Sequence, residues 1–401
     1  MRFWYNLSNT FFKGIKGQEL LKIPLKIAIV TNNYKPYSGG VVSSIDSFAN
    51  ELRLLGHEVL IVTLDFLGNG QSSDHGVFRI YCPIRFMYKN NHMAVPWRAD
   101  KVVYSLLKEF APDIIHSQHP FLLGVSALKA SKSLGIPLVF TYHTQYEKYL
   151  HYVPLPTVFT FPTVKKLANN YCNQVDGIIA PSQSIYNYLI SSNIKQIQII
   201  PSGILPIFLS DKLNIRKNKP FHLLTVSRFT KEKNIYFLLD VFSKLDQNEF
   251  IFTLIGYGAE LKPLQEYAYK HLNLSPDKIK FIEKPNKSII ASYYNSSDVF
   301  IFSSVTETQG LVLAEALAGG TPVIALNAAG SCDVIQNGVN GFLVETKEEM
   351  INKINLLSQD SVLHERLQYG AWATGNEFSP KNMTQKLVDF YFTIIKSKSN
   401  N

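Results

Sequence analysis

Apolar runs of four to six residues alternate with longer segments of helical periodicity along most of this chain. The runs at 25–30 and 59–63 flank one such segment. In it, apolar residues recur every three or four positions, at Val41, Val42, Ile45, Phe48, Leu52 and Leu55. Runs without polar alternation are typical of strands buried on both faces, as in a parallel sheet covered by helices. The pattern therefore predicts an α/β protein.

Two groups of such strands are separated by a polar segment at 206–220 that is rich in Lys, Asn and Pro. The first group lies at 25–30, 59–63, 78–81, 137–142, 176–180 and 197–200. The second group lies at 223–226, 250–255, 298–302 and 322–325. A chain of 401 residues also exceeds one ordinary core. We expect an N-terminal extension at 1–24, an N-terminal domain at 25–205 and a C-terminal domain at 206–380, both doubly wound and Rossmann-like.

The segment 298–325 reads as one strand–helix–strand unit. A polar turn separates its first strand from a helix predicted at 309–318, with Thr306 and Thr308 as plausible caps and Gly310 in the first turn. Such a helix start presents free backbone N–H groups and a positive dipole end to an anion. The sequence therefore predicts an anion site at this turn.

Two carboxylates, Glu307 in the turn and Glu315 on the helix, frame the predicted anion site. Acids are poor phosphate ligands, so they are better suited to accept hydrogen bonds from hydroxyl groups. A ligand with a diphosphate flanked by two polyols meets both demands, and a nucleotide sugar is such a ligand. The alternative is that the pair consists of an exposed turn acid and a solvated helix acid.

The spacing of the two acids, inside SSVTETQGLVLAEALAGGTPVIA, resembles the E-x7-E signature of the retaining glycosyltransferases of family 4. The resemblance implies the GT-B fold, in which two Rossmann-like domains face a central cleft and the final helix, here 381–396, crosses back onto the first domain. It implies that Glu307 contacts the donor sugar and that Glu315 contacts the ribose. It also implies donor binding at the helix start, by Thr308, Gln309, Gly310 and Leu311.

A second motif of the family lies just past the strand at 223–226. Arg228 and Lys233 match the Arg and Lys of its G-R-x-x-x-E-K-G pattern, although Ser227 and Asn234 replace the two glycines. A guanidinium and an ammonium at this place would stabilise a departing diphosphate. The family's Asn-Gly-Ile-Asp sequence is less well kept, because only its Gly and Ile are found in PSGILP at 201–206.

Three further positions have roles that the resemblance implies. Gly39 and Gly40, at a strand-to-helix turn, correspond to a glycine loop near the donor and the acceptor entrance. Gly256 and Gly258 stand where the family has a loop near the nucleotide. His143, at the end of the strand 137–142, resembles the active-site histidine that faces the donor sugar.

The net charge of +9 lies almost entirely in the first half of the chain. Up to Leu205 there are 19 Lys or Arg against 11 Asp or Glu, and from Pro206 onward 21 against 20. A basic half indicates an anionic partner, either phospholipid or nucleic acid, although generic solubility would also explain it.

The segment PIRFMYKNNHMAVPWRADK interleaves aromatic and basic residues without periodicity. This composition suits a phospholipid interface or single-stranded nucleic acid, and also a loop that covers the core. The segment TYHTQYEKYLHYVP resembles the diacylglycerol glucosyltransferase and phosphatidylinositol mannosyltransferase branches of the family. The residues predicted to contact the acceptor or the membrane are Arg85, Lys89, Trp97, Arg98 and Tyr146.

No apolar run approaches the 18 or so residues of a membrane-spanning helix, and the N-terminus lacks the apolar core of a signal peptide. The extension 1–24 mixes aromatic and basic residues, as in an interfacial anchor or an element packed on the fold. The three cysteines are far apart and lack metal-ligand spacing, which indicates a reducing compartment. We expect a cytoplasmic protein attached peripherally to the inner face of the cell membrane.

Together these observations predict the transfer of glucose from UDP-glucose to 1,2-diacylglycerol at an anionic membrane. No Asp-x-Asp motif is found, so no metal and no other cofactor is expected. The alternatives within the class are mannosyl transfer from GDP-mannose to phosphatidylinositol, or sugar transfer to a glycan. A basic protein that binds nucleic acid without catalysis is an alternative from another class, although no nucleic acid partner is expected. A Rossmann dehydrogenase is disfavoured because no G-x-G-x-x-G follows the first strand.

Overall fold

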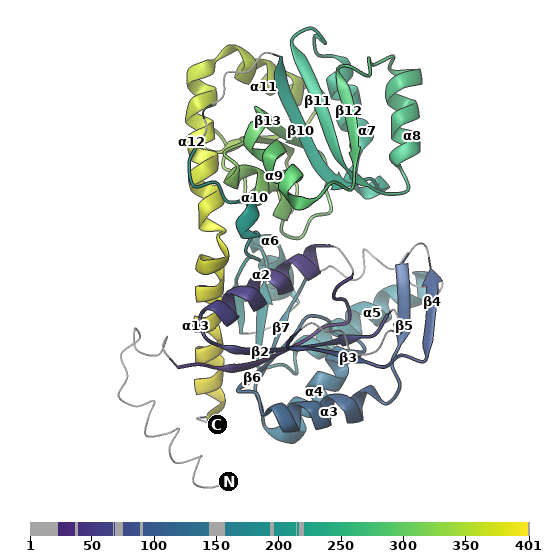
Figure 1. The fold of residues 1–401 in the computed structure, drawn as a ribbon, viewed down its shortest axis with the longest axis vertical. Coiled ribbons are helices and arrows are strands. Elements are labelled where there is room, and N and C mark those ends of the chain that lie inside the picture. Colours follow the sequence, from purple (N-terminus) through teal and green to yellow (C-terminus); the bar gives the residue numbers. More distant parts are fainter. Residues whose placement is uncertain are drawn as a thin grey trace. The chain divides into compact units, whose positions relative to one another are not determined.

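The computed structural model describes residues 23–36, 39–66, 68, 75–88, 91–143, 157–192, 196–213, 215 and 220–399. The chain divides into two compact units (Figure 1). Unit 1 comprises the residues up to Ile200 together with those from Met383 onward, and unit 2 comprises Pro201–Asn382. Most of the predicted extension 1–24 lies outside the described residues, as do Lys89 and Tyr146.

Unit 1 is built on a parallel sheet of seven strands in the order β3-β2-β1-β6-β7-β8-β9. In that order the strands are Val77–Ile80, Glu58–Leu64, Lys26–Val30, Ile114–Ser117, Leu138–Thr141, Gly177–Ala180 and Ile197–Ile199. The chain proceeds from β1 to one side and then returns to place β6 on the other. Sheets of this kind bind ligands at such a switch point, which lies here at the carboxyl ends of β1 and β6.

Helices cover both faces of this sheet because alternate strand residues point to opposite sides. The face with Ile27 and Ile29 packs against α2 (Gly40–Leu54) and α13 (Pro380–Ser399). The face with Ala28 and Val30 packs against four other helices. These are α3 (Ala99–Phe110), α4 (Leu123–Leu134), α5 (Thr157–Cys172) and α6 (Gln183–Ser191). The final helix therefore completes a unit whose other elements come from the first half of the chain.

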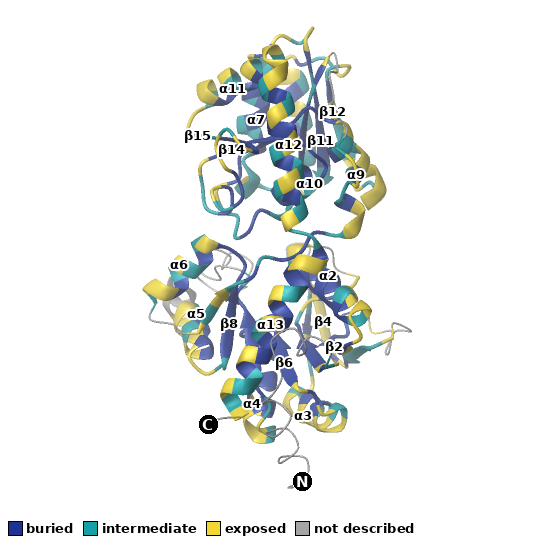
Figure 2. Cartoon of the chain, turned by 90° about the vertical axis from the view of Figure 1, so that its left-hand side faces the viewer, coloured by how far each residue is buried: buried dark blue, intermediate teal, exposed yellow. Residues whose placement is uncertain are grey.

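Unit 2 repeats this architecture with six parallel strands in the order β12-β11-β10-β13-β14-β15. In that order they are Ile279–Glu283, Phe250–Tyr257, Phe221–Arg228, Val299–Phe302, Val323–Leu326 and Gly341–Val344. Its switch point lies between β10 and β13. Figure 2 shows the strands of both sheets as buried elements under more exposed helices. The predicted α/β class with two Rossmann-like units is confirmed.

The helices of unit 2 also divide between the two faces of the sheet. One face carries α7 (Ile235–Ser243), α8 (Leu261–Glu266) and α11 (Lys347–Gln359). The other carries α9 (Lys287–Ser296), α10 (Leu311–Ala318) and α12 (Ser361–Glu377). The described part of unit 2 also contains three short helical segments, η3 (Pro206–Phe208), η4 (Lys231–Lys233) and η5 (Tyr267–His271). The predicted strands and helices thus recur in the structure, with shifts of a few residues at their ends.

One segment differs from its prediction. The stretch between β3 and α3, expected to be irregular, forms an antiparallel hairpin of β4 (Ile84–Tyr88) and β5 (Asn91–Val95). The aromatic and β-branched residues of this stretch favour strands. Pairs of side chains across the two strands stabilise the hairpin, which neither strand would form alone. Within the described part of the chain, no helix is long and apolar enough to cross a membrane.

Candidate functional site

The sequence-predicted residues of unit 2 gather at its switch point. β10 ends at Arg228 and runs into η4, while β13 is followed by the turn 303–310. The hydroxyl group of Ser303 donates to the carbonyl oxygens of Lys233 (3.0 Å) and Asn234 (2.9 Å). The two segments that follow neighbouring strands are thereby held against each other.

Lys233 and Glu307, both predicted to be catalytic, form an ion pair between Nζ and Oε1. Their side chains are only 11% and 18% exposed, so the pair is screened by water less than a surface pair. Arg228 lies nearby but is 45% exposed, with Nη2 3.7 Å from Glu232 Oε1. The structure therefore presents one mostly buried cation and one more exposed cation after β10.

The turn that carries Glu307 is packed by a glycine that the sequence did not indicate. Gly330 has φ +82°, and a Cβ atom at this position would lie 2.5 Å from Glu307 Cβ. Gly310 has φ +69°, and its Cβ would lie 3.0 Å from the carbonyl oxygen of Gly330. Gly330 follows β14, which pairs with β13. Its proximity to Glu307 therefore depends on the order of the strands in the sheet, which the sequence motif around Glu307 does not contain.

Helix α10 begins at Leu311, two residues later than predicted, with Gly310 as its N-cap in the left-handed region. The prediction that Thr306 or Thr308 caps this helix is wrong, because no side chain accepts a hydrogen bond there. The first backbone N–H groups consequently have no side-chain cap, which is the arrangement that binds an anion.

Gln309 uses its side chain for structure. Its Nε2 donates to the carbonyl oxygen of Ser202, and its Oε1 accepts from the N–H of Ser202, each at 3.0 Å. Both residues are buried. A predicted contact between Gln309 and the donor would therefore have to use its main chain.

Glu315 lies on α10, and its Oε2 accepts a 3.1 Å hydrogen bond from the hydroxyl group of Tyr294. Burial raises the pKa of Glu315 to about 7, and the hydrogen bond from Tyr294 and the charge of Lys287 only partly oppose this. The carboxyl group can therefore change its charge near neutral pH.

Gly256 and Gly258 have a packing role at the end of β11. A Cβ at Gly256 would lie 1.8 Å from the carbonyl oxygen of Ser227, and one at Gly258 would lie 2.2 Å from that of Phe229. Glycine is therefore required for close approach of β11 to β10. Contact of Gly256 and Gly258 with the nucleotide stays a prediction, because the packing of the two strands already requires glycine at both positions.

In unit 1, His143 follows β7 and lies beside the end of β6. Its Nε2 is 2.6 Å from Oε1 of Gln118, which accepts the hydrogen bond. Burial, with smaller contributions from the nearby His119 and His116, lowers the pKa of His143 to about 3. The imidazole is therefore neutral at physiological pH, with its proton on Nε2.

His119 is a feature of this edge to which the sequence analysis assigned no role. Its Nδ1 accepts from the backbone N–H of Asn32, at 3.2 Å, directly after β1. The Asn32 side chain in turn accepts from the N–H of Leu123 and donates to the carbonyl oxygen of Phe121, both at 3.1 Å. Burial lowers the pKa of His119 to about 4. The switch point of unit 1 is thus lined by neutral, hydrogen-bonded side chains.

The glycine loop of unit 1 leads into α2, with Gly39 as N-cap and Gly40 as first residue. Residues 37 and 38 lie outside the described part of the chain. The loop is held by Asp46 on α2, which accepts from the Tyr34 hydroxyl group at 2.7 Å and pairs with Lys35 Nζ at 3.0 Å.

Of the residues predicted to contact the acceptor or the membrane, the structure describes Arg85, Trp97 and Arg98, which lie on and beside the β4–β5 hairpin. Arg85 is turned toward Asp65, with Nη2 3.5 Å from Oδ2 and Nε donating to the carbonyl oxygen at 3.1 Å. Trp97 and Arg98 are exposed, and Arg98 is the N-cap of α3. Arg85 therefore has an internal partner that the sequence did not predict.

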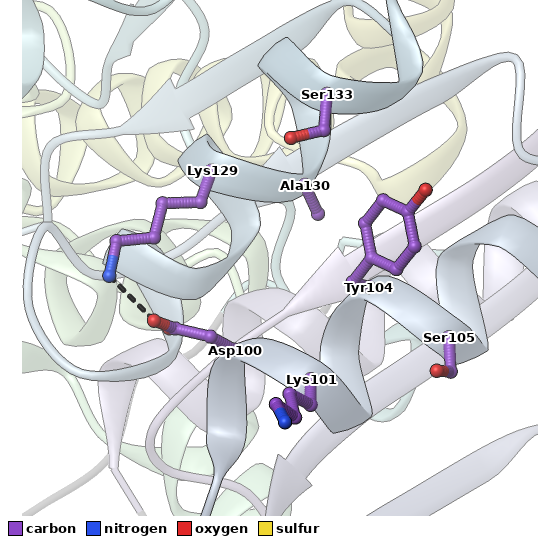
Figure 3. A pocket seen from close by; sticks show the side chains of 7 residues that line it. All are labelled: Asp100, Lys101, Tyr104, Ser105, Lys129, Ala130 and Ser133. Atoms are coloured by element: carbon purple, nitrogen blue, oxygen red, sulfur yellow. Dashed lines mark hydrogen bonds and ion pairs between the residues drawn. The ribbon is translucent and has the colours of Figure 1, made fainter.

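An open hollow of about 360 Å³ lies between α3 and α4 (Figure 3). It is lined by Tyr104 and Lys101 and closed on one side by an ion pair in which Lys129 Nζ lies 2.5 Å from Asp100 Oδ2. None of the predicted catalytic or donor-binding residues lines this hollow. We therefore describe two candidate sites, one at the switch point of each unit.

Comparison with known families gives two matches that together cover most of the chain. Residues 208–373 match the family described as Glycosyl transferases group 1, and residues 38–206 match Glycosyltransferase Family 4. An alpha-monoglucosyldiacylglycerol synthase of Streptococcus pneumoniae is 30% identical to this chain, over 94% of this chain and 87% of its own length. A GDP-mannose-dependent alpha-mannosyltransferase of Corynebacterium glutamicum is 27% identical, over 93% and 90%.

Solved structures with the same architecture are more distant in sequence. HepE of Anabaena, solved in complex with UDP, has a TM-score of 0.72 at 20% identity, over 90% of this chain and 98% of its own. Sucrose-phosphate synthase of Thermosynechococcus elongatus has a TM-score of 0.75 at 19% identity, over 93% and 100%. These likenesses confirm the predicted GT-B fold class.

Proposed function

The chain belongs to the group 1 and family 4 glycosyltransferases, and from this premise we propose that it moves glucose from UDP-glucose to 1,2-diacylglycerol at a membrane surface. The observation that carries the proposal is the mostly buried ion pair of Lys233 and Glu307, whose turn leads into the uncapped start of α10. A cation, a carboxylate and free N–H groups are the set that a sugar diphosphate requires.

The donor is assigned to the switch point of unit 2. Lys233 and Arg228 neutralise the diphosphate, and the start of α10 adds backbone N–H donors. Glu307 accepts hydrogen bonds from the sugar hydroxyl groups. Glu315 accepts from the ribose, where its ionised form is the better acceptor.

The reaction needs the C1–O bond to the β-phosphate to break and a bond from C1 to the acceptor oxygen to form. Negative charge develops on the leaving diphosphate, where Lys233, Arg228 and α10 stabilise it. The acceptor proton passes to the leaving phosphate on the same face of the sugar, so the α configuration is retained. Glu307 is paired with Lys233, which suits a role in binding and charge balance and not that of a nucleophile. The proposed cycle uses no metal.

Unit 1 is assigned to the acceptor. The neutral His143 and the buried polar contacts around it suit an uncharged hydroxyl group better than a charged one. The printed name of the Streptococcus pneumoniae relative supports glucose as sugar and diacylglycerol as acceptor. The basic first half supports attachment to the anionic inner face of the cell membrane.

A second candidate is a mannosyl transfer from GDP-mannose to phosphatidylinositol or a glycan. It is favoured by the similarity to the Corynebacterium glutamicum mannosyltransferase, which extends over nearly the whole chain. Both candidates use the same charges at the switch point of unit 2. They differ in the base and the sugar of the donor.

The test is a transfer assay with vesicles that contain diacylglycerol and anionic phospholipid, in the presence of EDTA. Radiolabelled UDP-glucose, UDP-galactose and GDP-mannose are supplied in parallel, with the variant Glu307→Gln as the inactive control. We expect label from UDP-glucose to enter the lipid phase. Label from GDP-mannose alone would favour the second candidate. No label and no release of nucleotide from any donor would overturn the proposal.

A further inference from the structure

The β4–β5 hairpin forms a sheet of its own in unit 1, separate from the seven-stranded sheet (Figure 1). Its strands pair in the register Ile84↔Val95, Arg85↔Ala94 and Phe86↔Met93. Because strand residues alternate between faces, this register gives the hairpin two chemically different sides.

The inner side is held to the body of unit 1. Arg85 bonds to Asp65, and its Nη1 would lie 2.5 Å from a Cβ atom at Gly68. Ala94, its cross-strand partner, is buried. Arg85 and Ala94 therefore hold this side to the body of unit 1, while Met87, two residues beyond Arg85 on the same side, is 57% exposed.

The outer side is apolar and open to solvent. Ile84, Phe86 and Val95 are between 43% and 57% exposed. Trp97 lies two residues after Val95, and its backbone N–H donates to the backbone carbonyl oxygen of Tyr81 at 3.4 Å. Trp97 and Tyr81 are each more than 60% exposed. Large apolar side chains gathered on one side of a small hairpin indicate a binding surface.

The surroundings of this side are cationic. Residues 77–110 contain six Lys or Arg, and only Asp100 and Glu109 as acids. Arg98 and Lys101 are exposed directly after Trp97. Apolar side chains bordered by Trp, Tyr and basic residues match the layered chemistry of an anionic bilayer, where acyl chains lie under headgroups.

We propose that the outer side of the β4–β5 hairpin, made by Ile84, Phe86, Met93 and Val95 with Tyr81 and Trp97 at its border, inserts into an anionic phospholipid surface. The proposal deepens the proposed function, because it names the surface through which unit 1 meets its lipid. It does not depend on sugar transfer, since insertion is measured without any donor. It also changes the prediction for Arg85, which supports the hairpin from within and does not contact the headgroups.

The experiment measures co-sedimentation of the full chain with vesicles of phosphatidylglycerol and phosphatidylcholine in equal parts, without nucleotide sugar. The variant Phe86→Ser with Trp97→Ser should raise the lipid concentration for half-binding at least about tenfold, because each side chain loses its transfer from water. The matched control is Val362→Ser with Tyr369→Ser, two exposed apolar residues on α12 of unit 2, which should bind as the original chain does. Equal binding of all three proteins would overturn the proposal.

Fluorescence gives a second readout that does not depend on the stability of a variant. The emission of the original chain should shift to shorter wavelength with these vesicles, and the conservative variant Trp97→Phe should bind equally while losing most of the shift. An unchanged shift in Trp97→Phe would overturn insertion at this side. Sedimentation velocity tests whether a second copy of the chain covers this surface instead. A dimer that dissociates when Phe86 and Trp97 are substituted would identify the surface as a contact between copies and would contradict the proposal.

Discussion

Lys233 Nζ forms an ion pair with Glu307 Oε1 and thereby joins the segment after β10 to the turn after β13. Each partner is mostly buried, so the loss of either charge leaves the other poorly solvated. The pair sets both the position and the electrostatic balance of the proposed donor site.

The first prediction concerns this pair. Glu307→Gln and Lys233→Ala should each lower kcat by about a hundredfold or more, because the charge that stabilises the leaving group is lost or misplaced. The double variant should lose little more than either single variant, since both act through one contact. Steady-state kinetics measure kcat for these variants. The control is Glu348→Gln, which replaces an exposed acid on α11. Multiplicative losses in the double variant would show that the pair does not act as a unit.

The second prediction tests the glycine behind Glu307. Gly330→Ala should displace the turn, because its Cβ would meet Glu307 Cβ at 2.5 Å, and activity should fall at least about tenfold. Gly338→Ala is a matched control, since Gly338 also has a positive φ but no atom within 4 Å of its Cβ. Both variants carry a backbone strain of about 1–2 kcal/mol. Similar kinetics for the two variants would exclude a specific effect on Glu307.

The third prediction concerns pH and stability. The pKa of Glu315 is raised from 4.5 to about 7 by burial, so the unfolded chain releases this proton at lower pH than the folded chain. The stability contributed by the neutral carboxyl group is therefore present below about pH 4.5 and is lost as the pH rises to about 7, by at most about 1.4 kcal/mol per pH unit. In Glu315→Gln this loss should disappear.

Urea unfolding of both proteins between pH 5 and pH 8 checks the third prediction. The difference between them must be used, because His116, His119 and His143 have depressed pKa values and produce the opposite slope below pH 6.5. Tyr294→Phe removes the hydrogen bond that lowers the pKa of Glu315, so the loss of stability should extend to higher pH. A constant difference in stability across this range would contradict a raised pKa.

The fourth prediction concerns the attachment of α13. The hydroxyl group of Tyr391 lies 2.6 Å from Nδ1 of His116, whose Nε2 lies 2.7 Å from Thr141 Oγ1. Tyr391→Phe leaves a buried ring nitrogen without its partner and should destabilise the protein by about 1–3 kcal/mol. Calorimetry should show a lower midpoint temperature of unfolding for this variant. Its kcat should stay unchanged at temperatures below the unfolding transition. Tyr369→Phe, on the surface of α12, should change neither.

The sequence predicted the fold well because buried parallel strands have a simple pattern of apolar runs. It also indicated Lys233 and Glu307, because they match two motifs of the family. Their direct contact could not be predicted, because it depends on β10 and β13 being neighbours, although they are far apart in the chain. The same limit explains why Gly330 was missed.

The polar contacts of unit 1 show a second limit of the sequence. Gln118 and His119 follow β6, and their partners follow β7 and β1. The prediction that Arg85 contacts the acceptor or the membrane rests on a segment in which aromatic and basic residues are interleaved. In the structure Arg85 pairs across the hairpin with the buried Ala94 and forms an ion pair with Asp65. Which side of a hairpin faces the body depends on tertiary packing that neither strand encodes by itself.

Helix α13 covers the face of the unit 1 sheet that carries Ile27 and Ile29. During synthesis on a ribosome, that face emerges first and its cover emerges after all of unit 2. Unit 2, which is continuous in the chain, can therefore complete its core before unit 1 does. For that interval this face of the unit 1 sheet has only α2 as its cover, so apolar side chains that α13 later buries remain exposed, and exposed apolar surface of this kind is prone to aggregation.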